Sequence, residues 1–448
     1  MPRSRTRPLT ALLATLALSA GAATAAPAQA ASDPLLPEQW ALSTPSATGA
    51  AEAWTQSTGA GVVVAVLDSG VQFDHPDLAD NLWTNPGEIP GNGVDDDRNG
   101  FVDDVHGANI VTPGAPAADD EGHGTHVAGI IAAQAGNGEG GSGIAPGARI
   151  MSVKVLDANR AGNSSLLARG IRYAVDQGAR ILNISLNGDG TSPDLDAALS
   201  YANDKGATLV TSAGNNSRDI DLRPSYPASS TVPAVLTVTA TQEDGGLLSI
   251  ANRGLSSVDL AAPGAMIMST ARGSRYELRQ GTSMAAPFVA GSLALLAAAR
   301  PDLSQPALRD ALVKSAPRPG VLAGLLGSGS LDVGAAMHRV LPGAMWHATP
   351  AAPADSGAAA RVKVLAKAKV PAGISTTVRW KASGDTRVAK WRVLLDGKRV
   401  GTVAKGKRSL LRKRVRSTGR HRWKVVGVDA RGKSVVSAAR SFRVVRKS

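Results

Sequence analysis

The sequence predicts an α/β protein with a mostly parallel sheet and helices on both faces, followed by a small all-β sandwich domain. Residues 61–68 (GVVVAVLD) form an unbroken apolar, β-branched run, typical of a strand buried on both faces. Similar runs occur at 148–155, 180–186, 208–212 and 234–240, with helical patterns between them at 165–178 and 194–205. Such alternation indicates a parallel sheet, whose functional sites form at the carboxyl ends of the strands.

The last hundred residues have a different pattern. A Pro- and Ala-rich segment, 342–360, shows little periodicity and is interpreted as a linker. About seven short strand-type runs then follow within residues 361–448, which favours a β-sandwich of the immunoglobulin or fibronectin type, with Trp380, Trp391 and Trp423 in its core. We therefore expect an α/β domain at 31–341, the linker, and a β domain at 361–448.

The first thirty residues have the features of a secretion signal. Three arginines precede an apolar stretch at 9–23, and Ala28-Gln29-Ala30 is a signal-peptidase motif. The alternative, a membrane anchor, is disfavoured because the stretch is short and built from small side chains. No later segment resembles a membrane span, and the chain has no cysteine, so disulfides are excluded. We expect residues 1–30 to be removed and the protein to be secreted, either released or retained at the cell surface.

Charge differs sharply between the two predicted domains. Residues 1–345 carry 22 Lys and Arg against 32 Asp and Glu, whereas residues 346–448 carry 27 against 4. A strongly basic domain suits a polyanion such as a cell-wall polymer, an anionic membrane surface or a nucleic acid. The alternative is a domain whose charges serve only solubility. No sequence-reading nucleic-acid motif is present.

Three short motifs carry the residues of a nucleophilic hydrolase. They are Asp68 in DSG at the end of the first buried strand, His123 in HGTHVAG, and Ser283 in GTSMAAP at the start of an Ala-rich helix. A serine hydroxyl becomes a good nucleophile only when a base takes its proton. An imidazole can be that base, and a carboxylate can hold the imidazole in the correct tautomer.

The order Asp, His, Ser and the three motifs resemble the subtilisin-like serine proteases over residues 33–340. The resemblance implies a secreted serine endopeptidase with Asp68, His123 and Ser283 as its triad and an acyl-enzyme intermediate. A zinc hydrolase using His123 and His126 is the alternative, but no HExxH motif or third ligand is evident. We therefore interpret His126 as a structural, hydrogen-bonded histidine.

The same resemblance implies further site residues. Asn215, in TSAGNNS, corresponds to the family's side-chain donor to the oxyanion; on its own it could equally be a turn residue. Substrate would bind as an added strand, and the matching residues are Ser185, Leu186, Asn187, Gly188, Ala213 and Gly214. Asn187 stands where the family usually has glycine, so its side chain is expected to narrow or polarise the pocket.

Two acidic groups of residues suggest structural calcium. The first is oxygen-rich and partly resembles an EF-hand loop, comprising Asp95, Asp97, Asn99, Asp103 and Asp104, although the closing Glu is absent. The alternative is a solvated acidic loop, but so many neighbouring carboxylates would repel one another without a cation. The second site is implied by the resemblance alone and comprises Asp33, Asp77 and Asn137.

Three functions remain in competition at this point. The leading prediction is a monomeric endopeptidase of broad specificity that acts on proteins or peptides. A narrower one is a processing protease with few targets, which uses the same chemistry. The third is a binding or adhesion protein with an inert protease fold, which is disfavoured because every residue that the chemistry requires is present.

Overall fold

The chain divides into two compact units, residues 1–349 and 350–448. The structure, a computed structural model, describes residues 33–344 and, beyond them, the segments 361–365, 369–371, 375–383, 390–396, 398–404, 410–414, 419–428 and 434–445. The predicted signal peptide, and the predicted linker apart from residues 342–344, lie outside the described residues.

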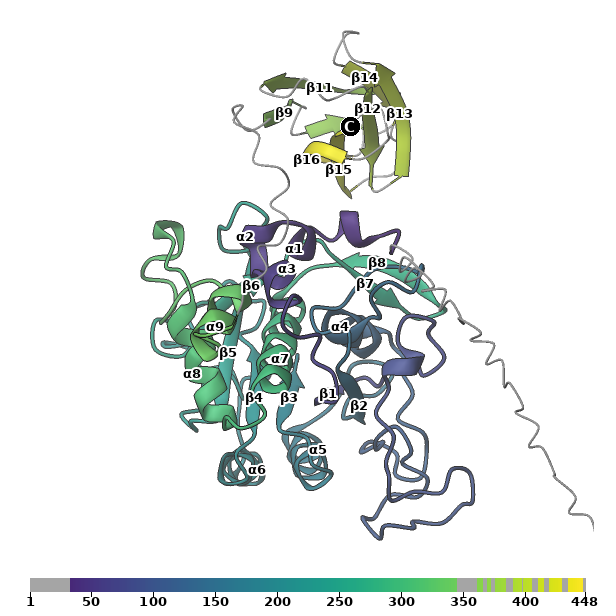
Figure 1. The fold of residues 1–448 in the computed structure, drawn as a ribbon, viewed down its shortest axis with the longest axis vertical. Helices are drawn as coiled ribbons and strands as arrows, with labels where there is room; N and C mark the ends of the chain where they lie inside the picture. Colours follow the sequence, from purple (N-terminus) through teal and green to yellow (C-terminus); the bar gives the residue numbers. More distant parts are fainter. Residues whose placement is uncertain are drawn as a thin grey trace, which may run out of the picture. The chain divides into compact units, whose positions relative to one another are not determined.

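A six-stranded sheet forms the centre of the first unit. Its order is β2-β1-β3-β4-β5-β6 and every neighbouring pair is parallel, so the predicted α/β architecture is confirmed (Figure 1). The strands are β1 (Val63–Asp68), β2 (Arg149–Lys154), β3 (Ile181–Ile184), β4 (Thr208–Ser212), β5 (Val235–Thr241) and β6 (Leu260–Pro263). β3, β4, β5 and β6 are buried along their whole length, which explains their continuous apolar sequences.

Helices cover both faces of this sheet, and each face has its own apolar core. One core includes residues of α4 (His123–Ala132), α7 (Thr282–Ala299), α8 (Gln305–Ser315) and α9 (Val333–Val340). The other core lies under α5 (Ser164–Asp176) and α6 (Pro193–Asp204). Side-chain caps start α5 and α6, where Asn163 and Ser192 accept from the backbone three residues on. The result is a three-layered arrangement.

Shorter elements complete the first unit. The N-terminal segment contains η1 (Leu36–Glu38), α1 (Trp40–Ser43), α2 (Pro45–Thr48) and α3 (Ala50–Ala53); η2 (Ala79–Asn81) and η3 (Gly320–Leu322) lie farther along. An antiparallel hairpin, β7 (Ile267–Ala271) and β8 (Arg275–Arg279), leads towards the start of α7.

Among the described residues, α7 is the one helix long and apolar enough to span a membrane by length and composition. It is 83% buried inside the protein and contacts several strands of the sheet. Its apolar character is therefore explained by its position in the core of the first unit.

The second unit contains two sheets in its described segments. One has the order β10-β16-β15-β12-β13 and the other β14-β11-β9. The strands are β9 (Arg361–Leu365), β10 (Lys369–Pro371), β11 (Ser375–Ser383), β12 (Lys390–Leu395), β13 (Lys398–Ala404), β14 (Leu410–Arg414), β15 (Gly419–Val428) and β16 (Ser434–Val445). Trp423 is fully buried, whereas the side chains of Trp380 and Trp391 lie outside the described part of the chain. The sandwich assignment stays a prediction.

Candidate active site

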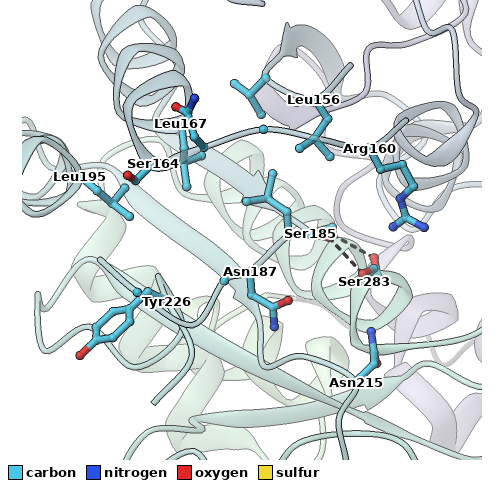
Figure 2. Close-up of a pocket in the computed structure, with 16 residues that line it drawn as sticks. Leu156, Arg160, Ser164, Leu167, Ser185, Asn187, Leu195, Asn215, Tyr226 and Ser283 are labelled. Carbon is cyan, nitrogen blue, oxygen red and sulfur yellow. Dashed lines mark hydrogen bonds between the residues drawn. The ribbon is translucent and has the colours of Figure 1, made fainter. Parts of the chain in front are cut away.

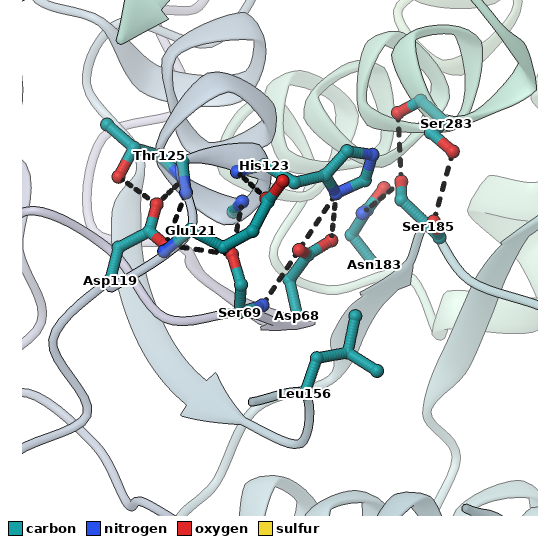
Figure 3. A network of polar contacts seen from close by, with 12 residues as sticks. Asp68, Ser69, Asp119, Glu121, His123, Thr125, Leu156, Asn183, Ser185 and Ser283 are labelled. Carbon is teal, nitrogen blue, oxygen red and sulfur yellow. Dashed lines mark hydrogen bonds and ion pairs between the residues drawn. The ribbon is translucent and has the colours of Figure 1, made fainter. Parts of the chain in front are cut away.

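The first candidate pair is an aspartate at the end of β1 and a histidine at the start of α4. Asp68 is fully buried, and its two carboxylate oxygens lie 2.8 and 2.9 Å from Nδ1 of His123. Figure 3 shows the imidazole between Asp68 and Ser283. This contact selects the tautomer that carries its proton on Nδ1 and leaves Nε2 able to accept one.

The N-terminus of α4 is held in place by the buried carboxylate of Asp119 (Figure 3). Oδ1 accepts from Ser69 Oγ and from the backbone N–H groups of Glu121 and Gly122. Oδ2 accepts from the backbone N–H and the hydroxyl of Thr125. The N–H groups of Gly122 and Thr125 are among the donors that a helix start leaves unpaired, and a negative charge there also suits the helix dipole. Sequence reasoning missed Asp119, whose signal is an acidic residue just before a helix.

A glycine allows this helix to approach β1 closely. A Cβ at Gly124 would lie 2.1 Å from the carbonyl oxygen of Gly70 and 3.2 Å from Cβ of Asp68. The backbone N–H of Gly124 instead donates to Ser69 Oγ, which itself donates to Asp119. The chain of contacts from Asp119 through Ser69 therefore ties α4 to the residue that follows Asp68.

Ser283 lies in the first turn of α7, beside the segment that follows β3. Its hydroxyl donates to the carbonyl of Ser185 over 3.0 Å, and the Ser185 hydroxyl donates back to the Ser283 carbonyl over 2.9 Å. No hydrogen bond joins Ser283 Oγ to His123 within residues 33–344. Rotation about the Cα–Cβ bond of Ser283 would redirect the hydroxyl, and such catalytic contacts often tighten only when substrate binds.

Asn215 follows β4 and its side chain is oriented by the residue that precedes Ser283. Its Oδ1 accepts from the backbone N–H of Thr282 over 2.9 Å, which leaves Nδ2 available to donate. Gly281 has φ of +144° and a Cβ there would lie 3.1 Å from the Asn215 amide, so glycine suits this position. In Figure 2 Asn215 and Ser283 stand at the same end of a cavity.

That cavity has a volume of about 380 Å³ and is open to solvent (Figure 2). Four of the predicted substrate residues line it, namely Ser185, Leu186, Asn187 and Gly188. The other two, Ala213 and Gly214, are buried and are not among its lining residues in the described part of the chain. The remaining lining residues that bear on its shape are three leucines, Leu156, Leu167 and Leu195, together with Arg160 and Tyr226.

The acidic loop brings together some of the residues predicted for calcium. Carboxylate oxygens of Asp95, Asp97 and Glu88 lie within 4.8 Å of one another. Glu88 was not predicted, and its Oε2 is buried with no hydrogen-bond partner among the described residues. Burial raises the pKa of Glu88, and nearby carboxylates including Asp104 and Asp97 add to this. An oxygen-rich, partly unsatisfied group of this kind fits a hard cation such as calcium.

The other predicted ligands, Asn99, Asp103 and Asp104, form hydrogen bonds with the backbone and with side chains in and around this loop. Asn99 donates through Nδ2 to Asp97 and Asp104. Asp104 also accepts from the hydroxyl of Tyr173 on α5. Asp103 accepts from the backbone N–H groups of residues 91–93 and so closes the far part of the loop.

The second predicted cation group is also brought together. Asp33 and Asp77 are buried, and both accept from the loop after α4. Asp33 Oδ1 accepts from Gly136, while Asp77 accepts from Nδ2 of Asn137 and from the backbone of Gly141. Burial raises the pKa of Asp77.

His126 is placed away from the Asp68 contact and is fully buried. Its Nε2 lies 3.1 Å from the carbonyl oxygen of Glu277 on β8. Burial lowers its pKa to about 3, with the charges of Arg279 and His123 acting in the same direction. Residues 33–344 show no acidic or histidine metal cluster that includes His126. This geometry is that of a neutral, structural histidine.

Comparison with known proteins places this arrangement in a family. Residues 59–339 match the model of the subtilase family of peptidases. Thermitase of Thermoactinomyces vulgaris is 41% identical over 248 residues, which cover 55% of this chain and 79% of thermitase. An extracellular protease of Xanthomonas campestris pv. campestris is 34% identical over 339 residues, 69% of this chain and 57% of that protein.

A solved structure agrees with these matches. The protease of Pseudoalteromonas arctica PAMC 21717 superposes with a TM-score of 0.58 at 28% identity, covering 69% of this chain and 99% of that one. The chain therefore belongs to the subtilase family and is a subtilisin-like, serine-type endopeptidase.

The position of His126 predicts a pH dependence of stability. Its pKa is lower in the folded state than the usual 6.5, so folding favours the neutral ring. The contribution of the neutral His126 ring to the free energy of unfolding is complete above pH 6.5. It is lost as the pH falls from 6.5 towards 3, by up to about 1.4 kcal/mol per pH unit. Denaturant unfolding between pH 7 and 4.5 should show a shallower pH slope in His126→Gln than in the wild type. Equal slopes would contradict this assignment.

Proposed function

We propose that the protein cleaves peptide bonds with Ser283 as nucleophile, His123 as general base and acid, and Asp68 as the carboxylate that orients the imidazole. The observation that carries the proposal is the buried, two-oxygen contact of Asp68 with His123 Nδ1, next to the N-terminus of the helix that bears Ser283. His123 Nε2 accepts the hydroxyl proton as Ser283 Oγ attacks the substrate carbonyl carbon.

The attack converts the carbonyl oxygen into an oxyanion, which needs donors already in place. Nδ2 of Asn215 supplies one, because its Oδ1 is fixed by Thr282. The backbone N–H of Ser283, in the first turn of α7, supplies the second. Loss of one such side-chain donor lowers kcat by about 10² to 10³ in subtilisin. Asn215→Leu removes the corresponding donor here, so we expect it to lower kcat by weakening the stabilisation of the oxyanion.

Collapse of this intermediate breaks the C–N bond. His123 returns the proton to the departing amine, and the acyl group stays on Ser283 Oγ. Water then attacks the ester carbonyl while His123 takes its proton, and the carboxylic acid product leaves with Ser283 restored. An extended substrate binds as an added strand along residues 185–188, which line the cavity. The resemblance to the family adds Ala213 and Gly214 as substrate-binding residues, although both are buried and do not line the cavity. The side chain of Asn187 narrows the cavity, but the enzyme still accepts a broad range of peptide substrates.

Calcium is proposed as a structural cofactor held by the two acidic groups. Glu88, Asp95 and Asp97 would supply carboxylate oxygens in the first, supported by Asn99, Asp103 and Asp104. Asp33, Asp77 and Asn137 would supply the second, at the loop after α4. The cation would offset the repulsion of carboxylates that are otherwise costly to bury.

Cellular location and domain organisation are proposed from the sequence. Residues 1–30 are a signal peptide, the peptidase domain spans 31–341, and the mature protein acts outside the cell as a monomer, either free or at the cell surface. Similarity to an extracellular protease supports this location. Residues 361–448 form a basic β-sandwich joined by the linker 342–360, and the strands described in that region are compatible with it.

The nucleophile can be identified by covalent labelling. A fluorophosphonate probe should label the wild type in a time-dependent manner and leave Ser283→Ala unlabelled, because only an activated hydroxyl attacks the phosphorus. Ser292→Ala is the matched control, since Ser292 lies on the same helix with its hydroxyl bound to the Phe288 carbonyl. Labelling of Ser283→Ala at the wild-type rate would refute the assignment.

Calcium binding at the acidic loop is tested by substitution of Glu88, whose Oε2 has no hydrogen-bond partner among the described residues. Glu88→Gln removes one charged ligand but keeps the shape, so the apparent Kd for calcium should rise about tenfold. Calcium titration monitored by Tm gives this value. Asp204→Asn, at the exposed end of α6, is the control that should leave the apparent Kd unchanged. The proposal fails if Glu88→Gln and wild type show the same calcium dependence.

The basic region is proposed to bind polyanions through its excess of Lys and Arg. Full-length protein should be retained on heparin at low salt and elute as salt is raised, because released counterions drive such binding. A chain ending at residue 344 should pass through the same column. Equal retention of both proteins would place the binding elsewhere, and absence of retention at low salt would reject it.

A further inference from the structure

Arg160 is the one charged residue among those that line the cavity at Ser283, within the described part of the chain. Its side chain makes no hydrogen bond or ion pair with any described residue. In the view of Figure 2 its guanidinium extends towards the end of the cavity that holds Ser283 and Asn215. Leu167 and Leu195 stand at the opposite end.

The loop that carries Arg160 is well defined by its own hydrogen bonds. Asp157 and Ala161 are joined by a backbone bond, and Asp157 Oδ1 accepts from the N–H groups of Asn159 and Ala161. Arg160 occupies the left-handed region with φ of +61°, and its side chain is exposed. These backbone bonds lower the pKa of Asp157, so its carboxylate is committed to the loop.

The base of the loop is anchored in the protein interior. Lys154, at the end of β2, is buried and donates to the carbonyl oxygens of Ser69 and Leu156. It also forms an ion pair with Asp120 over 2.6 Å. The segment that leads into the Arg160 loop is thus connected to the same residue, Ser69, that links Asp68 to α4.

The carboxylates that adjoin lining residues have partners of their own: Asp194 accepts from the hydroxyl of Ser165, and Asp196 accepts from that of Thr191. Asp189 lies between two lining residues, Gly188 and Gly190, but it pairs with Arg218 over 2.5 Å. The cavity therefore presents one uncompensated positive charge and otherwise neutral polar and apolar groups. A guanidinium in such a place favours a carboxylate, which it can bind through two parallel N–H donors.

We infer that Arg160 is a specificity-determining residue that selects substrates with an acidic side chain close to the scissile bond. The inference rests on the proposed role of Ser283 and adds to it the substrate class. Arg160 itself takes no part in bond cleavage, and its guanidinium contacts the substrate carboxylate. Peptides that differ only in charge at one position should therefore be cleaved at different rates.

The experiment uses pairs of internally quenched peptides that carry Glu or Gln at one position, scanned over the residues on each side of the cleaved bond. The measured quantity is the ratio of kcat/KM for the Glu peptide to that for the Gln peptide. For full-length wild-type protein the ratio should reach about two- to fivefold at one position, as expected for a partly exposed ion pair. In Arg160→Gln the ratio at that position should fall to about one.

Charge reversal separates recognition from structural damage. Arg160→Glu should prefer a Lys peptide over its Gln partner at the same position, an inversion that a misfolded loop would not produce. Arg223→Gln is the control, because Arg223 is exposed and does not line the cavity, and it should keep the wild-type ratio.

Failure of the inference about Arg160 and failure of the proposed function give different results in this experiment. A wild-type ratio of one or less at every position, or a raised ratio that survives in Arg160→Gln, overturns the role of Arg160 while the peptidase assignment stands. If the wild type cleaves every peptide no faster than Ser283→Ala, the proposed function fails and this inference fails with it.

Discussion

The buried carboxylate of Asp119 fixes the position of the helix that carries His123. It accepts from two backbone N–H groups before α4, from both donors of Thr125 in its first turn, and from Ser69. Because Ser69 directly follows Asp68, the same carboxylate sets the spacing between the aspartate and the histidine. A shift of α4 by even an ångström would break the contact with Nδ1 on which the proposed mechanism depends.

The parallel sheet supplies the rest of the site through its topology. β1, β3 and β4 are neighbours, so Asp68, the last residue of β1, lies at the same edge as Ser185 and Asn215, which follow β3 and β4. Helices α4 and α7 begin at this edge and bring His123 and Ser283 to it with their N-termini. A helix start offers free N–H groups and a favourable field for negative charge, which suits an oxyanion. The fold therefore gathers the serine, the histidine and two helix N-termini at one edge of the sheet before substrate binds.

The sequence predicted those parts of the fold and of the candidate site that depend on a local motif. The apolar runs predicted the parallel sheet, because strands buried on both faces have little choice of residue. The motifs around Asp68, His123 and Ser283 predicted residues that the structure places together. Asp119, Glu88 and Arg160 were not predicted, since their roles depend on partners that only the tertiary fold brings near. Asp103 has a contact that its spacing did not indicate, because its carboxylate accepts from the backbone N–H groups of residues 91–93.

A crystal structure of the full-length protein inactivated by a peptidyl phosphonate ester would test the central claim most directly, because the adduct mimics the tetrahedral intermediate. The account predicts a bond from phosphorus to Ser283 Oγ, with this side chain rotated away from the Ser185 carbonyl. It also predicts a phosphonyl oxygen within hydrogen-bonding distance of Asn215 Nδ2, and an unbroken contact of His123 with Asp68. A bond to another residue, or a phosphonyl oxygen directed away from Asn215, would contradict it.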